Sequence, residues 1–405
     1  MNTTLAQMSL RASLPILFLG FLLAGCQSST EPSANAAQPQ PTAAFVANPQ
    51  KVAAQEVKTL AIGAQAPDFN LPGVDGKFYS LQDFKNAKAL VVVFTCNHCP
   101  TAQAYEDRII AFTADYKSKG VEVVAISPNS PLGLLYEELG YSDLNDDFTA
   151  MQQRAADHKF NFPYLYDGDT ETASLQYGPA ATPHVFVFDQ ARKLQYTGRL
   201  DKKEKPGTAN AEDLRAATDA VLAGQPVGEP VTQTFGCSTK WGWKLELHAK
   251  ADADWAAKEV KLSGIDAKGV RALLKNSDSG KLRLINIWAT WCGPCVLEYP
   301  DFLVLQRMYG ARDFEFVSIS ADKMEKEAKV LEFLKSKQSG VTNYLFSEQD
   351  KYALAEAIGK EWNGALPYTL LVEPGGKVVW AQQGEVDFQA LKRTIVDNAM
   401  MGRVY

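Results

Sequence analysis

The chain has 405 residues, of which 46% are hydrophobic and 22% are charged, a composition typical of a soluble globular protein. This length exceeds what one ordinary hydrophobic core organises, so we expect two or three domains. With 41 basic and 47 acidic side chains the net charge is −6, and basic residues occur only in short runs, which argues against nucleic acid as a partner.

The first 25 residues have the pattern of an export signal. Arg11 precedes an apolar run, Leu14 to Leu23, which is too short to span a bilayer and fits the apolar region of a secretory signal. The run leads into Leu-Ala-Gly-Cys, ending at Cys26, which resembles the bacterial lipobox. We therefore expect residues 1–25 to be a lipoprotein signal peptide and Cys26 to carry lipid. A plain secretory signal with an accidental cysteine is the alternative.

Residues 26–58 form the predicted anchor and linker. Most of this segment is rich in Ala, Pro, Gln, Ser and Thr, so it cannot form a core and is expected to be a flexible tether. In the lipobox pattern, Gln27 after the cysteine favours the outer membrane over the inner one. We predict a protein that is anchored by lipid in the cell envelope and faces the periplasm.

Residues 59–228 form the first predicted domain. An apolar run, Leu90 to Phe94, leads to Cys96-Asn97-His98-Cys99, and a helical pattern then continues to Gly120. The loop Pro128 to Asp146 is long enough to predict a role at the rim of a site. The other expected elements are the strand Val121 to Ser127, the helix Phe148 to Lys159, the strands Tyr164 to Tyr166, Val185 to Phe188 and Leu194 to Leu200, and the helix Glu212 to Leu222.

Residues 229–250 are the expected inter-domain segment, and they contain Cys237. This cysteine could resolve a disulfide of Cys96, bind a metal ion, or simply be a buried small side chain. The sequence leaves all three readings open.

Residues 251–405 form the second predicted domain and repeat the order of the first. The apolar run Leu284 to Trp288 leads to Trp291-Cys292-Gly293-Pro294-Cys295, which opens a helix. The other expected elements are the strand Phe314 to Ser320, the helix Lys326 to Ser336, the strands Tyr368 to Val372 and Val378 to Ala381, and the helix Phe388 to Ala399.

The two cysteine pairs predict redox chemistry. A disulfide across two intervening residues closes too small a loop to stabilise a fold much, so a structural staple is disfavoured. A thiol at a helix N-terminus faces free backbone N–H groups, which stabilise its thiolate. We therefore expect Cys96 and Cys292 to attack disulfides, and Cys99 and Cys295, screened inside the first turn, to resolve them. An inert buried pair is the alternative.

The order of strand, cysteine pair on a helix, strand, helix, proline-led hairpin and helix resembles the thioredoxin fold. The second half, with its WCGPC motif, resembles the TlpA/ResA branch of exported thiol-disulfide oxidoreductases. The first half, with Phe-Thr-Cys-Asn-His-Cys-Pro, is similar to redoxin-domain proteins related to peroxiredoxins. The fold class is therefore expected to be α/β, with two tandem thioredoxin-like folds, each a central mixed sheet flanked by helices, after the signal and tether.

The resemblance implies a cis-proline loop that faces each cysteine pair and docks extended substrate backbone. Pro183 and Pro367 match this position, and the preceding Thr182 and Leu366 would touch the thiolate and tune its pKa. An X-Pro turn before a strand can also be purely structural.

Three further features are expected to tune the pairs. Glu298, three residues after Cys295, matches the buried acid of the TlpA/ResA branch and would move the proton of the resolving thiol; a solvated surface glutamate is the alternative. His98 would stabilise the reduced first pair and make it more oxidising than the second, which has Gly293 and Pro294 between its cysteines. His98 could also be an exposed bystander.

These expectations describe an exported thiol-disulfide oxidoreductase whose partners are protein disulfides and an upstream electron-donor protein. A relay of electrons between its two pairs is a further option. We expect no metal and no cofactor beyond the redox-active disulfides Cys96–Cys99 and Cys292–Cys295. One rival is a peroxidase in which Cys96 attacks peroxide, although Val93 and Ala89 replace residues usual in peroxiredoxins. The other rival is a copper carrier of the Sco type that uses Cys96, Cys99 and a distant His or Cys237.

Overall fold

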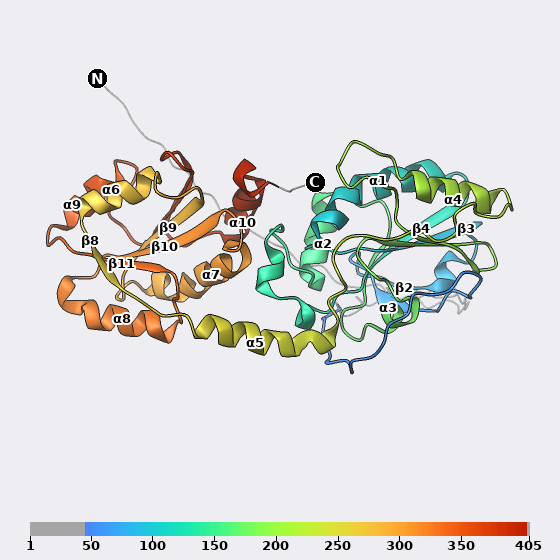
Figure 1. The fold of residues 1–405 in the computed structure, drawn as a ribbon, viewed down its shortest axis with the longest axis horizontal. Helices are drawn as coiled ribbons and strands as arrows, with labels where there is room; N and C mark the ends of the chain where they lie inside the picture. Colours follow the sequence, from blue (N-terminus) through green and yellow to red (C-terminus); the bar gives the residue numbers. More distant parts are fainter. Residues whose placement is uncertain (1–44, 403–405) are drawn as a thin grey trace, which may run out of the picture. The chain divides into compact units, whose positions relative to one another are not determined.

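The computed structural model describes residues 45–402, which contain two separate main sheets with helices on both faces of each (Figure 1). The predicted signal peptide and Cys26 lie outside the described residues. Within residues 45–402, no helix combines the length and the apolar character needed to cross a membrane.

The first sheet has five strands in the order β5-β4-β3-β6-β7. Strands β3, β4 and β5 are parallel, and β6 and β7 are antiparallel additions on the other side of β3. Its elements are β3 (Ala89–Phe94), α1 (Pro100–Lys117), β4 (Val121–Ser127), α2 (Phe148–Asp157), β5 (Tyr164–Tyr166), α3 (Thr172–Tyr177), β6 (His184–Phe188), β7 (Leu194–Gly198) and α4 (Glu212–Leu222), preceded by the hairpin β1 (Asn70–Pro72) and β2 (Phe78–Ser80).

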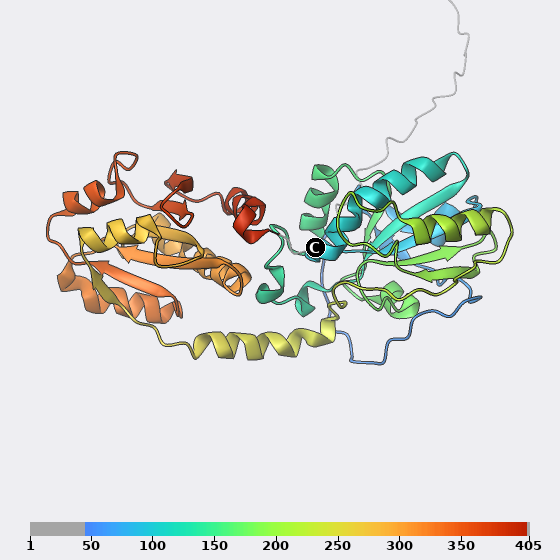
Figure 2. The same cartoon turned by 45° about the horizontal axis from the view of Figure 1, so that its top comes forward.

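Alternate side chains of β3 enter two different cores, because successive residues of a strand point to opposite faces. Val91 and Val93 pack with residues of α1, α2 and α4 on one face. Leu90 and Val92 pack with residues of α3 and of the N-terminal hairpin on the other face. Figure 2 shows α1 and α4 together on one side of this sheet and α3 on the opposite side. The strand is therefore buried on both faces, as its unbroken apolar sequence predicts.

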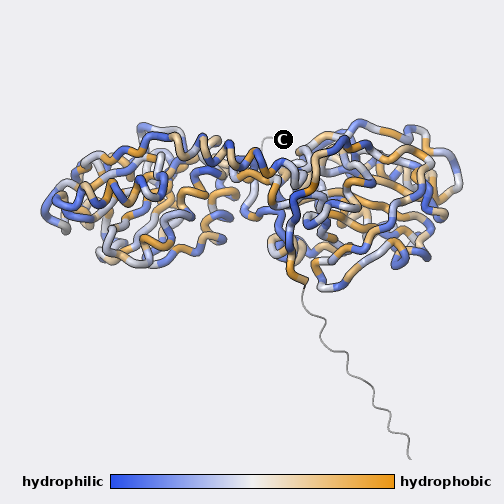
Figure 3. The backbone as a smooth tube through the Cα atoms, turned by 90° about the horizontal axis from the view of Figure 1, so that it is seen from below, coloured by the Kyte–Doolittle hydropathy of each residue, from blue (hydrophilic) through white to orange (hydrophobic). Residues whose placement is uncertain are grey.

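The second sheet has six strands in the order β13-β12-β9-β10-β11-β8. Leu284 of β9 contributes to the core beneath α7, α8 and α10, whereas Ile285 contributes to the core beneath α6 and α9. Hydrophobic stretches of the chain gather inside each domain (Figure 3). The elements are β8 (Ser263–Ile265), α6 (Ala267–Lys275), β9 (Leu282–Trp288), α7 (Gly293–Tyr309), β10 (Phe314–Ser320), α8 (Glu327–Ser336), β11 (Thr342–Phe346), α9 (Lys351–Ile358), β12 (Tyr368–Val372), β13 (Val378–Gln383) and α10 (Phe388–Asp397).

Parts of the segments expected to be linkers contact the first domain. Residues from 45 onward lie against the first domain, where the Phe45 ring is 4.8 Å from that of Phe148. After α4, residues 230–242 also hydrogen-bond to the first domain rather than crossing freely to the second. The helix α5 (Leu245–Ala256) then spans the expected boundary at residue 250.

Candidate functional site

The second cysteine pair lies where β9 ends and α7 begins. Cys292 is the N-cap residue of α7, and its Sγ accepts a hydrogen bond from the backbone N–H of Cys295 at 3.4 Å. The two cysteines form a disulfide. Cys292 is 6% exposed and Cys295 is 1% exposed, so the first cysteine is nearer to solvent. Gly293 and Pro294 form the first turn between them, and this placement favours a Cys292 thiolate.

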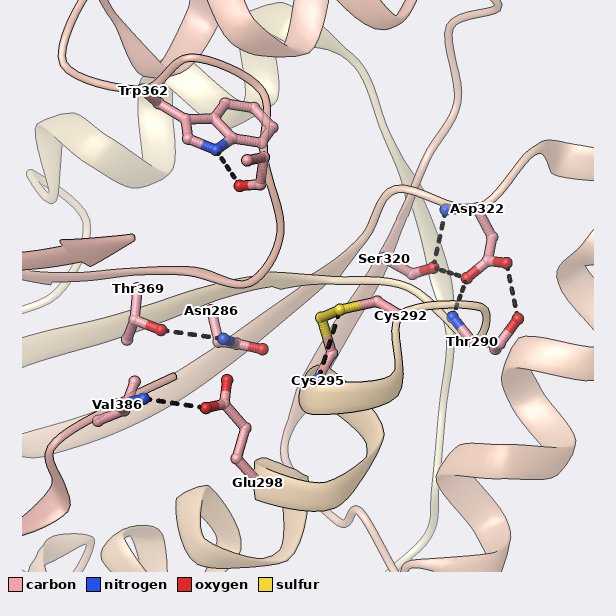
Figure 4. The surroundings of a disulfide bond; sticks show 11 residues. Asn286, Thr290, Cys292, Cys295, Glu298, Ser320, Asp322, Trp362, Thr369 and Val386 are labelled. Atoms are coloured by element: carbon pink, nitrogen blue, oxygen red, sulfur yellow. Dashed lines mark hydrogen bonds between the residues drawn. A yellow bond between two sulfur atoms is a disulfide. The ribbon is translucent and has the colours of Figure 1, made fainter. Parts of the chain in front are cut away.

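A buried acid lies one turn below this disulfide. Glu298 is only 7% exposed, and its Oε2 accepts a hydrogen bond from the backbone N–H of Val386 at 3.1 Å, whereas Oε1 is buried and has no hydrogen-bond partner among the described residues. Figure 4 shows the carboxyl group directed toward Val386 and Asn286, on the side of α7 that carries Cys295. Burial raises the pKa of Glu298 to about 7, against the opposing effect of the Val386 hydrogen bond. It is therefore not the solvated surface glutamate considered as the alternative.

A second buried acid holds the loop before Cys292. Asp322, just after β10, accepts hydrogen bonds at 2.7 Å from both the backbone N–H and the hydroxyl of Thr290, and Ser320 donates a third (Figure 4). Sequence reasoning missed Asp322. The available signal was its position after a parallel strand next to β9, because the carboxyl ends of parallel strands meet at one edge of a sheet.

The surface around Cys292 is open and partly apolar. Trp291 is 67% exposed and lines a pocket together with Met324 and Phe346. The Leu366–Pro367 peptide bond is cis, and Leu366 packs against the core cluster that contains both cysteines. The exposed Trp291 therefore places an apolar contact beside Cys292.

The first pair differs in where its helix begins. Pro100 is the first residue of α1, so Cys99, and not Cys96, is the N-cap residue. Both thiols are free and buried, with exposures of 1% for Cys96 and 0% for Cys99. We expected Cys96 to lie at the helix end and nearer to solvent. Cys99 takes the N-cap position instead, and both thiols are buried to nearly the same degree.

The electrostatics of the first pair favour a thiolate on Cys99. Burial would raise the pKa of Cys99, but hydrogen bonds from Cys237 and Cys96, together with the charge of His98, hold it well below its usual range. The pKa of Cys96 is raised, first by burial and then by its hydrogen bond to Cys99. We expected Cys96 to attack and Cys99 to resolve, whereas the lowered pKa belongs to Cys99.

The cis-proline loop of the first domain contacts both thiols. The Thr182–Pro183 bond is cis. Thr182 Oγ1 lies 3.2 Å from Cys96 Sγ, and its carbonyl oxygen lies 3.2 Å from Cys99 Sγ. Thr182 therefore touches the pair in the way that the resemblance implies.

His98 is buried rather than an exposed bystander. Its Nδ1 lies 2.5 Å from Asp146 Oδ2, whereas its Nε2 has no hydrogen-bond partner within residues 45–402. Burial would lower the pKa of His98, but the charge of Asp146 raises it. Asp146 also accepts hydrogen bonds from the backbone N–H groups of Asn97 and His98, so it shapes the CNHC loop as Asp322 shapes the second one. Asp146 ends the loop that we expected at the rim of the site.

Cys237 lies in contact with the first cysteine pair. Its backbone N–H donates a hydrogen bond to Cys99 Sγ at 3.3 Å, and its side chain packs against the cluster of Cys96, Cys99 and Ala102. We considered it as a resolving partner of Cys96, but the structure places it against Cys99 instead. Three thiols therefore meet at one end of the first sheet.

Comparison with known proteins matches two segments of the chain to one family. The Redoxin family model matches residues 61–214 and 253–399. The thiol-disulfide oxidoreductase ResA of Oceanobacillus iheyensis is 27% identical over 154 residues, which covers 36% of this chain and 71% of the relative. ResA of Bacillus cereus is 30% identical over 125 residues, covering 30% of this chain and 64% of the relative. A thioredoxin of Coprinus comatus is 39% identical over 59 residues, which cover 14% of this chain and 56% of the relative.

The chain spans less than two thirds of the length of the Bacillus cereus ResA and of the Coprinus comatus thioredoxin. Among solved structures, a hypothetical protein of Sinorhizobium meliloti is 34% identical with a TM-score of 0.41, covering 46% of this chain and 97% of that one. A putative thiol:disulfide interchange protein DsbE of Chlorobium tepidum is 24% identical with a TM-score of 0.32, and the match covers 40% of this chain and 99% of that one. The family model matches more than half of the chain, and the chain therefore belongs to the Redoxin family.

Proposed function

We propose that this protein is a thiol-disulfide oxidoreductase that reduces protein disulfides through Cys292 and Cys295. The observation that carries the proposal is a disulfide at the start of α7 with the buried carboxyl group of Glu298 one turn below it. A thiolate at a helix N-terminus is the form that attacks disulfides. An acid with a pKa near neutrality can exchange a proton at physiological pH.

The reaction starts from the reduced pair. The Cys292 thiolate attacks one sulfur of the substrate, which forms a mixed disulfide and releases the other substrate sulfur as a thiolate that takes a proton. Glu298 then accepts the proton of Cys295, and the Cys295 thiolate attacks Cys292, which releases the second substrate thiol. The substrate gains two electrons, and the protein ends with the Cys292–Cys295 disulfide. A dithiol donor protein must then reduce this disulfide again.

The test compares two serine variants of the full chain on a protein disulfide. Cys292→Ser removes the attacking sulfur and should abolish reduction and adduct formation. Cys295→Ser keeps the attacking sulfur but cannot resolve, so it should accumulate a mixed disulfide that non-reducing electrophoresis and mass spectrometry detect. Equal loss of activity in both variants, with no adduct on Cys295→Ser, would contradict the assigned roles.

The proposal also covers location and partners. We propose that a lipid on Cys26 anchors the protein in the cell envelope, facing the periplasm, on the basis of the lipobox-like Leu-Ala-Gly-Cys. Its partners would be protein disulfides and a dithiol donor, and the Cys96/Cys99 pair would act as a second redox centre. The burial of Cys96 disfavours the rival reading in which this thiol attacks peroxide directly.

A second candidate function is the binding of a soft metal ion at the first pair. Cys96, His98 and Asp146 are all buried, and one potential ligand atom of each lies within 4.8 Å of the others. Thiolate and imidazole suit Cu(I) and Zn(II). This cluster is the specific observation that favours the candidate.

Metal analysis decides this candidate. The reduced full chain carrying Cys292→Ser and Cys295→Ser, which removes competing thiols, should retain stoichiometric zinc or copper after desalting. Asp146→Asn and Cys96→Ser, added separately, should each lower the bound metal at least tenfold. Reduced protein without metal after loading with Zn(II) and Cu(I) would exclude the candidate and leave the redox proposal intact.

A further inference from the structure

Residues 230–242 form a strand-like segment that runs back across the cysteine pair of the first domain. At its start, the backbone N–H of Thr197 in β7 donates a hydrogen bond to the Pro230 carbonyl at 2.9 Å. At its end, the backbone N–H of Ser130 donates to the Lys240 carbonyl at 2.8 Å. Both ends of this segment, which we call the return segment, are therefore fixed to the first domain.

The middle of the return segment pairs with the cis-proline loop. Thr182 and Cys237 form an antiparallel bridge, in which the backbone N–H of Thr182 donates to the Cys237 carbonyl at 2.9 Å. An extended polypeptide that approaches the buried pair would use this backbone edge, since an exposed edge is where a strand can be added. The chain itself already occupies the position of such a peptide.

The return segment brings its cysteine to the pair. Cys237 donates its backbone N–H to Cys99 Sγ at 3.3 Å, and its thiol also hydrogen-bonds to Cys99. Cys96 and Cys99 are fully buried, whereas Cys237 is only partly buried. Of the three cysteines, Cys237 is the most exposed to solvent.

We propose that the return segment is a built-in docking strand and that Cys237 exchanges a disulfide with Cys99. Starting from a Cys96–Cys99 disulfide, the Cys237 thiol gives up its proton and attacks Cys99 Sγ; the Cys99–Cys237 bond forms, the Cys96–Cys99 bond breaks, and Cys96 leaves as a thiolate that takes a proton. The number of disulfides is unchanged, so the exchange needs no external oxidant. It moves the oxidised state to a sulfur that a dithiol partner can attack.

This inference rests on the proposed function in one respect, because it requires the Cys96/Cys99 pair to cycle between dithiol and disulfide. It adds Cys237 as a third redox-active cysteine, through which a dithiol partner could reduce the buried Cys96/Cys99 pair.

Disulfide mapping tests the sulfur assignment. The full chain carrying Cys292→Ser, Cys295→Ser and Cys96→Ser keeps Cys99 and Cys237 as its remaining thiols within residues 45–402. Oxidised glutathione should convert them to a Cys99–Cys237 disulfide, which a non-reducing digest and mass spectrometry identify as one linked peptide pair. If Cys99 and Cys237 remain alkylatable to the same extent as before oxidation, the proposal is wrong.

Gly236 offers a test of the docking geometry. Its φ is +135°, and a Cβ there would lie 2.0 Å from the carbonyl oxygen of Thr182, so alanine cannot be accommodated in the paired strand. Gly236→Ala, made in the same triple-serine background, should slow formation of the Cys99–Cys237 disulfide at least tenfold and speed alkylation of Cys237. Gly228→Ala is the matched control, because a Cβ at Gly228 would meet no atom within 4 Å.

The outcomes are separable. Unchanged rates in a folded Gly236→Ala variant would overturn the docking strand, and the mapping experiment decides the sulfur exchange even if that variant does not fold. Neither measurement depends on turnover of a protein substrate. If the triple-serine variant forms no Cys99–Cys237 disulfide while the wild-type chain still reduces a protein disulfide through Cys292, this inference alone is overturned.

Discussion

Two aspartates take corresponding places beneath the two cysteine loops. Asp146 binds the backbone N–H groups of Asn97 and His98, and Asp322 binds the backbone N–H of Thr290 just before the second pair. Each acid is buried and hydrogen-bonded, so it fixes the loop that presents the thiols. The sequence repeat predicted the cysteines but not these supports, because the two aspartates stand at different distances from the pairs they serve.

The buried carboxyl group of Glu298 predicts how the rate of mixed-disulfide resolution depends on pH. Its pKa is raised to about 7, so its carboxylate becomes available as a base only as the pH rises through that value. The rate of mixed-disulfide resolution in the full chain should rise with an inflection near pH 7. Glu298→Gln should remove the inflection and slow resolution by about 10²-fold, the lower end of the usual contribution of a positioned base. Stopped-flow measurement of resolution between pH 5 and 9 checks this.

The same shift predicts the pH dependence of stability. The folded pKa of Glu298 is above its unfolded value, so the folded state binds the proton more tightly, and stability falls as the pH rises from the unfolded pKa to about 7. Glu298→Gln should therefore become more stable relative to wild type across this interval. Glu385→Gln removes an exposed carboxylate whose charge helps to raise the pKa of Glu298, so as the control it should keep the kinetic inflection and move it to a lower pH. An unchanged profile in Glu298→Gln would mean that the carboxyl group takes no part in resolution.

At the scale of elements, the apolar pattern predicts the central strands well. The predicted bounds of β4, β10 and β12 agree with the structure, because these strands are mostly apolar and buried and lie between turn signals. The edge strand β8 and its neighbour β11 were missed. Both are short, and β11 carries polar residues such as the buried Asn343, whose partners come from distant segments.

The helices α1 and α7 begin at different positions relative to their cysteine pairs, which the two-cysteine spacing alone did not predict. Proline is favoured in the first turn of a helix, where its missing N–H costs nothing. In the second motif Pro294 lies between the cysteines, so Cys292 becomes the N-cap. In the first motif Pro100 follows the pair, so Cys99 becomes the N-cap and Cys96 remains in the loop. This difference was readable in the sequence. The contact between Cys237 and Cys99 was not, since it depends on the path of the return segment.

At the scale of the whole molecule, the chain carries two redox centres of different character. The thiolate of Cys99 is stabilised by hydrogen bonds from two other cysteines and by the charge of His98, which favours the reduced state of the first pair. The second pair has no such cation among its described contacts and lies above the acid Glu298. We therefore predict that the Cys96/Cys99 pair is the more oxidising, so electrons would flow from the second pair to the first.

Redox titration of the full chain checks this direction. Two variants, each with one pair replaced by serines and both carrying Cys237→Ser, should be titrated against glutathione and dithiothreitol. The equilibrium constants of the two pairs should differ at least tenfold, which corresponds to about 30 mV for two electrons. His98→Gln should lower the potential of the first pair and leave the second unchanged, because this imidazole lies beside the first pair, where its charge lowers the pKa of Cys99. Because one chain holds both pairs at high effective concentration, even this modest difference would set the direction of transfer. A first pair that is equally or more reducing than the second would reverse the proposed flow.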